Sequence, residues 1–115
     1  PDVDPETQWT TVAENLAYAA DEAAKAGVLQ VVEPLNPYDA PGFLLSTASR
    51  GFALVEEIGH PNLKLQFDVY HTQRTEGNLA ATIAARVGLI GHIQVADSPD
   101  RHEPGSGEIA WPFVF

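Results

Sequence analysis

The feature of this sequence that most constrains its fold is a threefold alternation of helix-like segments with short apolar strands. Each strand ends on a polar residue, in the segments Val31-Val32-Glu33, Gln66-Phe67-Asp68 and His92-Ile93-Gln94. Strands that alternate with helices predict a parallel sheet, because each helix carries the chain back to the start of the next strand. Parallel sheets hold their ligands at the carboxyl ends of their strands. We therefore expect the working part of an α/β enzyme.

Local signals set the expected boundaries of these segments. The strands are expected at residues 28–33, 63–68 and 90–95. Helix starts are expected at the Thr11–Glu14 capping box, at Ser46 or Thr47, at Asn78 and at Trp111. Gly27 and Gly59 suit helix ends, and loops are expected at 34–42, 69–77 and 97–108.

The length of 115 residues suits one domain, so we expect a single unit over residues 1–115. Three strands cannot close a barrel, and an open parallel sheet of this size leaves two bare edges. The sequence also has no Met and ends on the apolar run 113–115. We expect a piece of a longer (β/α)₈ barrel, with a complete small domain as the alternative. A non-catalytic half-barrel that covers its edges by associating with itself, as a homo-oligomer, or with another chain is a third interpretation.

Charge and composition exclude several classes of function. The formal net charge is −10, which disfavours binding to a polyanion such as DNA. A small anionic substrate then needs a local cation to hold it. The absence of Cys excludes a disulfide framework, a thiolate metal site and a Cys nucleophile. The sequence has no membrane-length apolar run and no signal-peptide pattern, so we expect a cytoplasmic protein without a membrane partner.

The three strand ends predict a metal site. Side chains alternate across a strand, so Glu33, Asp68 and Gln94 are expected in one layer at the top of the barrel. Two carboxylates and an amide oxygen are hard ligands that suit Mg²⁺ or Mn²⁺ better than Zn²⁺ or Cu²⁺. Each residue alone is more often a solvated or capping residue at a strand end, and the matching positions of all three favour the metal site.

Two further side chains on the same rim are candidate substrate contacts. His71 follows Asp68 by three residues and can bind a substrate oxygen or a ligand carboxylate, or it is simply an exposed loop histidine. Arg101 lies in the loop after the third strand, where its guanidinium can bind a substrate carboxylate bidentately. The alternative for Arg101 is a surface ion pair with Asp100 or Glu103.

Four long motifs resemble those of the hydroxypyruvate isomerases, a family of xylose-isomerase-like TIM barrels related to the tagatose epimerases and endonuclease IV. The motifs are Glu33-Pro34-Leu35-Asn36, the segment from Gln66 to Arg74, the segment from Gly91 to Asp97, and the segment from Arg101 to Ile109. By this resemblance, the chain is the second half of a TIM barrel, from the fourth helix through the seventh strand.

The resemblance also implies roles for the candidate residues. Glu33 matches a metal ligand that is also one of two catalytic glutamates, while Asp68 and Gln94 match the second and third ligands. His71 and Arg101 match residues that contact substrate oxygens. A fourth ligand, a glutamate on the eighth strand, is expected beyond residue 115. The implied cofactor is a divalent cation, Mg²⁺ or Mn²⁺, and the implied substrate is a small hydroxy-keto acid.

The implied reaction interconverts hydroxypyruvate and tartronate semialdehyde by metal-assisted proton transfer through an enediolate. Within the family, a 2-oxo-tetronate isomerase or another sugar isomerase or epimerase is the alternative. An endonuclease IV-like phosphodiesterase is less favoured, because those enzymes cluster several histidines and approach DNA with a basic surface.

Overall fold

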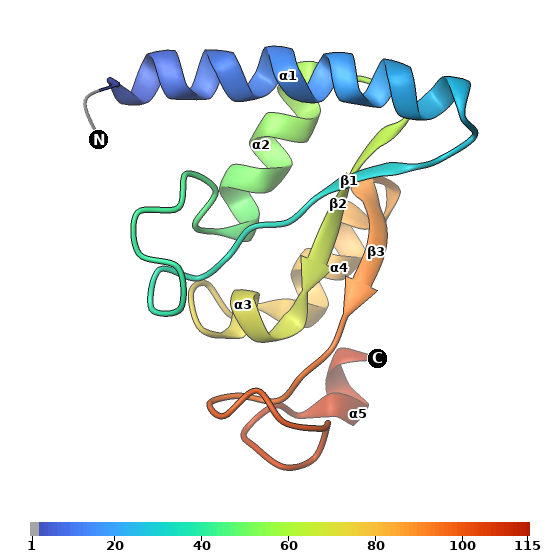
Figure 1. Ribbon diagram of the computed structural model, residues 1–115. Helices are drawn as coiled ribbons and strands as arrows, with labels where there is room; N and C mark the ends of the chain where they lie inside the picture. The colour runs from blue at the N-terminus through green and yellow to red at the C-terminus, as the bar shows by residue number, and fades with distance from the viewer. Residues whose placement is uncertain (1–2) are drawn as a thin grey trace.

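A three-stranded parallel sheet forms the centre of the structure, a computed structural model that describes residues 3–115. The strands lie in the order β1-β2-β3 (Figure 1), with the bounds Gln30–Val32, Leu63–Asp68 and Ile90–Gln94. Val32 lies opposite Leu65, and Asp68 lies opposite Gln94, so both strand pairs run in parallel. The predicted alternation is confirmed, and within the described residues the sheet stays open, as part of a barrel.

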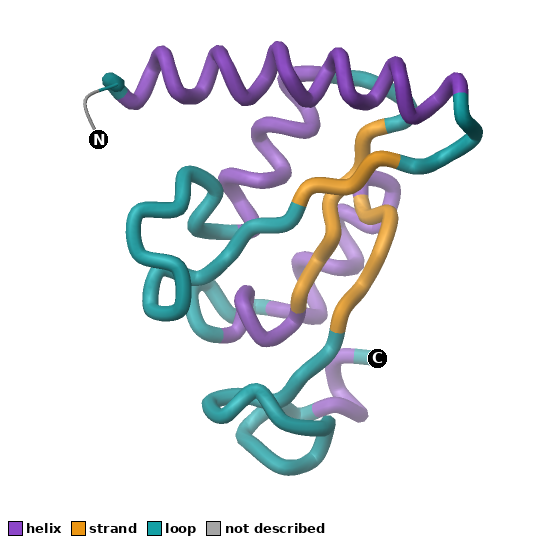
Figure 2. Tube along the Cα trace, viewed as in Figure 1, coloured by secondary structure: helices purple, strands orange, loops and turns teal. Residues whose placement is uncertain are grey.

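Within residues 3–115, five helices and one 3₁₀ turn accompany the sheet: α1 (Pro5–Lys25), α2 (Ala48–Ile58), α3 (Val69–Gln73), α4 (Leu79–Arg86), η1 (Val87–Leu89) and α5 (Trp111–Val114). Helix α1 lies across the end of the sheet where the strands begin. In Figure 1, α4 lies behind the sheet, and α2 lies below α1, beside β2. The loops that follow the strands gather at the opposite end (Figure 2). Across residues 3–115, no helix is long and apolar enough to span a bilayer.

Strand β2 supplies the core from one of its two faces. Leu63, Leu65 and Phe67 alternate along the strand, are almost fully buried and belong to the same apolar cluster as Phe52 and Val55 of α2. The rings of Phe52 and Phe67 stack with their centroids 6.3 Å apart. Because side chains alternate along a strand, burying these residues under the helices turns the intervening side chains to the opposite face.

The opposite face of the sheet carries the polar residues. Gln66 and Asp68 occupy the alternate positions of β2, and Gln94 lies beside Asp68 on β3. Glu33 follows β1 directly, in the position expected to share this face. The residues selected from the sequence therefore lie along one rim of the sheet, at the carboxyl ends of its strands.

The start of α1 differs from the expectation, and the capping box predicted at Thr11–Glu14 is wrong. The helix begins at Pro5 with Asp4 as its N-cap, seven residues before Thr11, and the side chain of Asp4 accepts a hydrogen bond from the Thr7 amide at 3.0 Å. The Thr11 hydroxyl instead donates to the Thr7 carbonyl inside the helix. An aspartate N-cap followed by Pro at the first position is the stronger start signal.

Other boundaries also change. Strand β1 is shorter than the expected span 28–33, and the expected loop 69–77 begins with helix α3, which Asp68 caps. The expected helix start at Asn78 is confirmed, since Asn78 is the N-cap of α4, but its φ of 50° lies in the left-handed region and its side chain makes no capping bond. The expected limits of α2, Thr47 and Gly59, are confirmed.

Replacement of Gly51 by Ala is expected to destabilise the fold. An added Cβ would lie 2.6 Å from Leu65 Cδ1 and 2.6 Å from Pro34 Cγ, between α2 and the core. Overpacking of this kind costs about 1–3 kcal/mol, which exceeds the gain in helix propensity of about 1 kcal/mol. The thermal midpoint of the full-length protein is the measurement. Gly88→Ala is the matched control, because nothing lies within 4 Å of its added Cβ; equal midpoints for the two variants would contradict the prediction.

Candidate metal centre

Three side chains from three consecutive segments meet at the rim of the sheet. Glu33 follows β1, Asp68 ends β2, and His71 lies in α3, and each offers one atom within 4.8 Å of the others. Asp68 and His71 are 2% and 4% exposed. Glu33 Oε1 and His71 Nε2 are buried without a hydrogen-bond partner among the described residues. Buried polar atoms are normally paired, so these two atoms are arranged for a further group.

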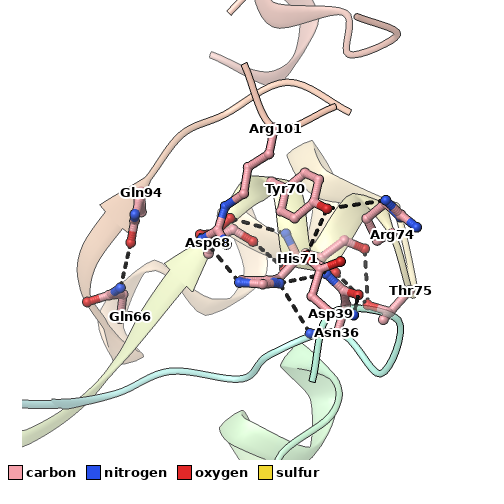
Figure 3. Close-up of polar contacts among 11 residues, drawn as sticks. Asn36, Asp39, Gln66, Asp68, Tyr70, His71, Arg74, Thr75, Gln94 and Arg101 are labelled. Carbon is pink, nitrogen blue, oxygen red and sulfur yellow. Dashed lines mark hydrogen bonds and ion pairs between the residues drawn. The ribbon is translucent and has the colours of Figure 1, made fainter. Parts of the chain in front are cut away.

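Asp68 contacts both His71 and Arg101, as Figure 3 shows. Its Oδ1 accepts the backbone N–H of His71 at 3.1 Å, which makes it the N-cap of α3. Its Oδ2 lies 3.4 Å from Arg101 Nη2 and 4.0 Å from His71 Nε2. Two carboxylates in a buried place need positive charge nearby, and the exposed end of Arg101 supplies only part of it. The donor set therefore fits a hard divalent cation.

Gln94 lies beside this cluster, opposite Asp68 in the register of β2 and β3. Its Oε1 accepts a hydrogen bond from Gln66 Nε2 at 2.7 Å (Figure 3). The amide oxygen is thus engaged by Gln66 in this structure, although the side chain is on the same face as the carboxylates. Its role as third ligand stays a prediction.

His71 is held as a neutral ring by its surroundings. Burial lowers its pKa below the usual value, and the charge of Arg101 acts in the same direction. The carboxylates of Asp68 and Glu33 oppose this shift without overcoming it. The ring Nδ1 faces Asn36 (Figure 3), so His71 is a buried residue of the cluster and not the exposed loop histidine considered as its alternative.

Arg101 pairs with the cluster and not with its sequence neighbours. Its guanidinium lies over the ring of Tyr70 at 5.1 Å and reaches Asp68, as Figure 3 shows. The alternative pairing with Asp100 or Glu103 is absent from the ion pairs of residues 3–115. Arg101 adopts a φ of 60°, and its side chain is 43% exposed, so one side of the fork stays open to a ligand.

Asp97 fixes the loop that carries Arg101, a role that was not predicted from the sequence. Its carboxylate accepts four hydrogen bonds, from the N–H groups of Ser98, Gly105 and Ile109 and from the indole of Trp111, at 2.7–3.1 Å. Burial alone would raise its pKa, but these donors outweigh burial and lower the pKa well below its usual range. An acidic residue at the start of a long Gly- and Pro-rich loop is the one local signal that could have indicated this role.

The backbone of Asp97 closes the same loop. Its N–H donates to the His102 carbonyl at 2.8 Å, and its carbonyl accepts the Arg101 N–H at 2.9 Å. Gly107 packs so closely that an added Cβ would lie 2.0 Å from the Ser98 carbonyl oxygen. The position of Arg101 therefore depends on contacts made by residues up to fourteen positions from Asp97.

A partial parallel sheet with carboxylates at its strand ends defines this chain as part of an α/β-barrel protein. Residues 1–115 match the model of the xylose isomerase-like TIM barrel family, and the chain belongs to that family. Hydroxypyruvate isomerase of Escherichia coli K12 is 45% identical over 105 residues, which cover 91% of this chain and 41% of that protein. The 2-oxo-tetronate isomerase of Cupriavidus necator is 47% identical over 105 residues, which cover 91% of this chain and 40% of that protein.

A crystal structure of an AP endonuclease, family 2, from Brucella melitensis superimposes with a TM-score of 0.93 at 37% identity. The match covers 98% of this chain and 44% of that one. The chain thus spans about two fifths of the length of the relatives it matches. The predicted fold and family are confirmed, and the roles of the five site residues stay predictions.

Replacement of Asp97 by Asn is expected to loosen the loop, because an amide cannot accept four hydrogen bonds through one oxygen. The amides of Gly105 and Ile109 should exchange with solvent at least about tenfold faster, which hydrogen-exchange mass spectrometry would detect. The exposed Asp100→Asn variant in the same loop is the control. Unchanged exchange at both amides would contradict the assigned role.

The stabilising effect of Asp97 should also depend on pH. A pKa that is lower in the folded than in the unfolded state adds stability above the unfolded pKa of about 3.9, and this stability is lost as the pH falls below that value. The difference in thermal midpoint between wild type and Asp97→Asn should therefore be largest near neutral pH and narrow below about pH 4. A constant difference across this range would contradict the assignment.

Proposed function

We propose that the protein containing this chain is a divalent-metal-dependent isomerase that interconverts hydroxypyruvate and tartronate semialdehyde. The observation that carries this proposal is the cluster of half-buried Glu33 with buried Asp68 and His71, which has two buried polar atoms without partners, on the rim of the sheet. The identity of 45% to Escherichia coli hydroxypyruvate isomerase supports the choice of reaction. The reaction is written for the full-length protein, since the chain covers 41% of that relative.

Glu33, Asp68 and Gln94 would hold the cation, Mg²⁺ or Mn²⁺. Glu33 Oε1 has no partner among the described residues, and the oxygens of Asp68 and Gln94 lie on adjacent strands. All three are hard oxygen donors of the type these cations prefer. When bound, the cation acts as a Lewis acid that stabilises negative charge on the oxygens of the reacting carbons.

The reaction needs one proton to leave C3 of hydroxypyruvate and one to be added at C2, while a hydroxyl proton moves from O3 to O2. Glu33 is proposed as a catalytic residue that takes or returns one of these carbon-bound protons, which suits a carboxylate buried beside the reacting atoms. His71 would contact a substrate oxygen, and Arg101 would bind the substrate carboxylate through its open side. The enediolate charge would then be stabilised by the cation and by the neutral His71 donor.

A 2-oxo-tetronate isomerase is the second candidate, because the Cupriavidus necator enzyme of that name is 47% identical to this chain. The chemistry is the same on an acid with one more carbon. A panel of hydroxypyruvate and 2-oxo-tetronate acids, compared by kcat/KM with the full-length protein, would decide between them.

DNA is not proposed as a substrate, although one similar structure is that of an AP endonuclease. The net charge of −10 would repel a polyanion, and the cluster contains one histidine. A titration with fluorescent abasic DNA tests this exclusion. Homo-oligomer formation and a cytoplasmic location stay predictions from the sequence.

Replacement of Glu33 by Gln should lower kcat for hydroxypyruvate by about 10²–10⁴-fold, because Gln keeps the shape but cannot transfer a proton. The measurement is turnover by the full-length protein with Mg²⁺ or Mn²⁺. The exposed Glu14→Gln in α1 is the matched control and should retain wild-type turnover. A Glu33→Gln enzyme with the wild-type rate would remove Glu33 from the mechanism.

Replacement of Arg101 by Gln should act mainly on substrate binding. Loss of a charge-assisted pair to the carboxylate should raise KM by about 10–100-fold, with a smaller change in kcat. Arg86→Gln is the matched control, because Arg86 pairs with Glu56 on α2, away from the rim. An unchanged KM for Arg101→Gln, measured by initial rates, would show that another group holds the carboxylate.

A further inference from the structure

Asn36 is fully buried in the loop after β1, and both ends of its side chain are engaged. Its Oδ1 accepts the backbone N–H groups of Tyr38 and Asp39, each at 3.0 Å. Its Nδ2 lies 3.1 Å from Asp39 Oδ2 and 2.7 Å from His71 Nδ1 (Figure 3). The two backbone donors fix the orientation of the amide, so the NH₂ group, and not the oxygen, faces His71.

The backbone N–H and the side-chain NH₂ of Asn36 together decide which nitrogen of His71 carries the proton. The Asn36 N–H points at His71 Nδ1 from 3.2 Å. A peptide N–H can only donate, and so can the amide NH₂ beside it, so Nδ1 must be an unprotonated acceptor. A ring with an unprotonated Nδ1 is neutral and carries its one proton on Nε2.

The proton on Nε2 points into the carboxylate cluster. Nε2 is buried without a hydrogen-bond partner among residues 3–115, and it lies 4.0 Å from Asp68 Oδ2. A nitrogen that carries a proton has no free lone pair, so it cannot bind a metal ion. The three-residue cluster therefore divides into two carboxylate ligands and one hydrogen-bond donor.

We propose that Asn36 is a positioning residue that holds His71 as the Nε2–H tautomer, so that His71 donates to an oxygen of the bound ligand and does not coordinate the metal. The state of the ring rests on the geometry alone, while the identity of that oxygen rests on the proposed function. A neutral donor at this place would stabilise an enediolate oxygen without adding a competing cation to the metal site.

The first test reads the ring nitrogens directly. The full-length protein is labelled with ¹⁵N-histidine, and the His71 signals are assigned by their loss in His71→Gln. Nδ1 should show the chemical shift of an unprotonated nitrogen and Nε2 that of a protonated one, both without metal and with saturating Mg²⁺. A protonated Nδ1, or the loss of the Nε2 proton when Mg²⁺ is added, would overturn the proposal.

The second test changes the donor into an acceptor. In Asn36→Asp, the carboxylate can still accept the N–H groups of Tyr38 and Asp39, but it faces Nδ1 as a charged acceptor in place of the 2.7 Å donor. This acceptor should outweigh the backbone N–H that remains at 3.2 Å, so Nδ1 should become protonated. The kcat of the isomerase should fall by about 10–100-fold. Asn62→Asp is the matched control, since Asn62 also donates through its amide, to two carbonyls beyond the site, and its replacement should leave the His71 shifts unchanged.

The two proposals can fail separately. If the protein lacks isomerase activity but the wild-type nitrogens and the Asn36→Asp shift are as expected, the role of Asn36 stands and the proposed reaction falls. If the protein isomerises hydroxypyruvate while Nδ1 is protonated, or while Asn36→Asp leaves Nδ1 unprotonated, the reaction stands and the role of Asn36 is wrong. If Asn36→Asp does not fold, Asn36→Ala removes the 2.7 Å side-chain donor, and the population of the Nδ1-protonated ring should rise. His71 shifts that are the same in Asn36→Ala as in the wild type would show that the side chain of Asn36 does not hold the ring.

Discussion

The alternation of side chains along β2 is the constraint on which the rest of the structure depends. Leu63, Leu65 and Phe67 must face the helices to be buried. Because side chains alternate along a strand, Asp68 then lies on the opposite face of the sheet. A slip of one residue would expose this apolar set and bury the polar one. Burial of these apolar side chains therefore also fixes the face of the sheet on which the Asp68 carboxylate lies.

Asp68 then connects the core to the site, because it is both the last residue of β2 and the N-cap of α3. The cap orients α3 so that His71, three residues later, returns toward the same carboxylate. Glu33 brings a second carboxylate into the cluster. Burial of two negative groups is unfavourable unless positive charge compensates them, so this corner of the fold is built to attract a cation or a charged ligand.

The parts of the structure that follow from local signals could be predicted from the sequence. The periodicity of apolar residues predicted the parallel sheet and placed Glu33, Asp68 and Gln94 on one rim, and the motifs indicated the family. The start of α1 was missed because Thr11 and Glu14 satisfy the same local rule as a true cap, and only Asp4 followed by Pro5 outweighs it. Helix α3 was missed because five residues are too few to show a helical period.

The residues that fix the site escaped prediction for a different reason, since their partners lie far away along the chain. Asp97 binds Trp111 across fourteen positions, and Asn36 faces His71 across thirty-five. No residue spacing in the sequence indicates either contact, because loop geometry, and not helix or strand periodicity, brings the groups together. The charged residues at strand ends define what the rim can bind, but these two buried polar residues define how His71 and Arg101 are presented to it. A protein with the same three strand ends but with other residues at positions 36 and 97 would keep the carboxylates of the rim. It would lose the fixed orientation of the donors His71 and Arg101 around them.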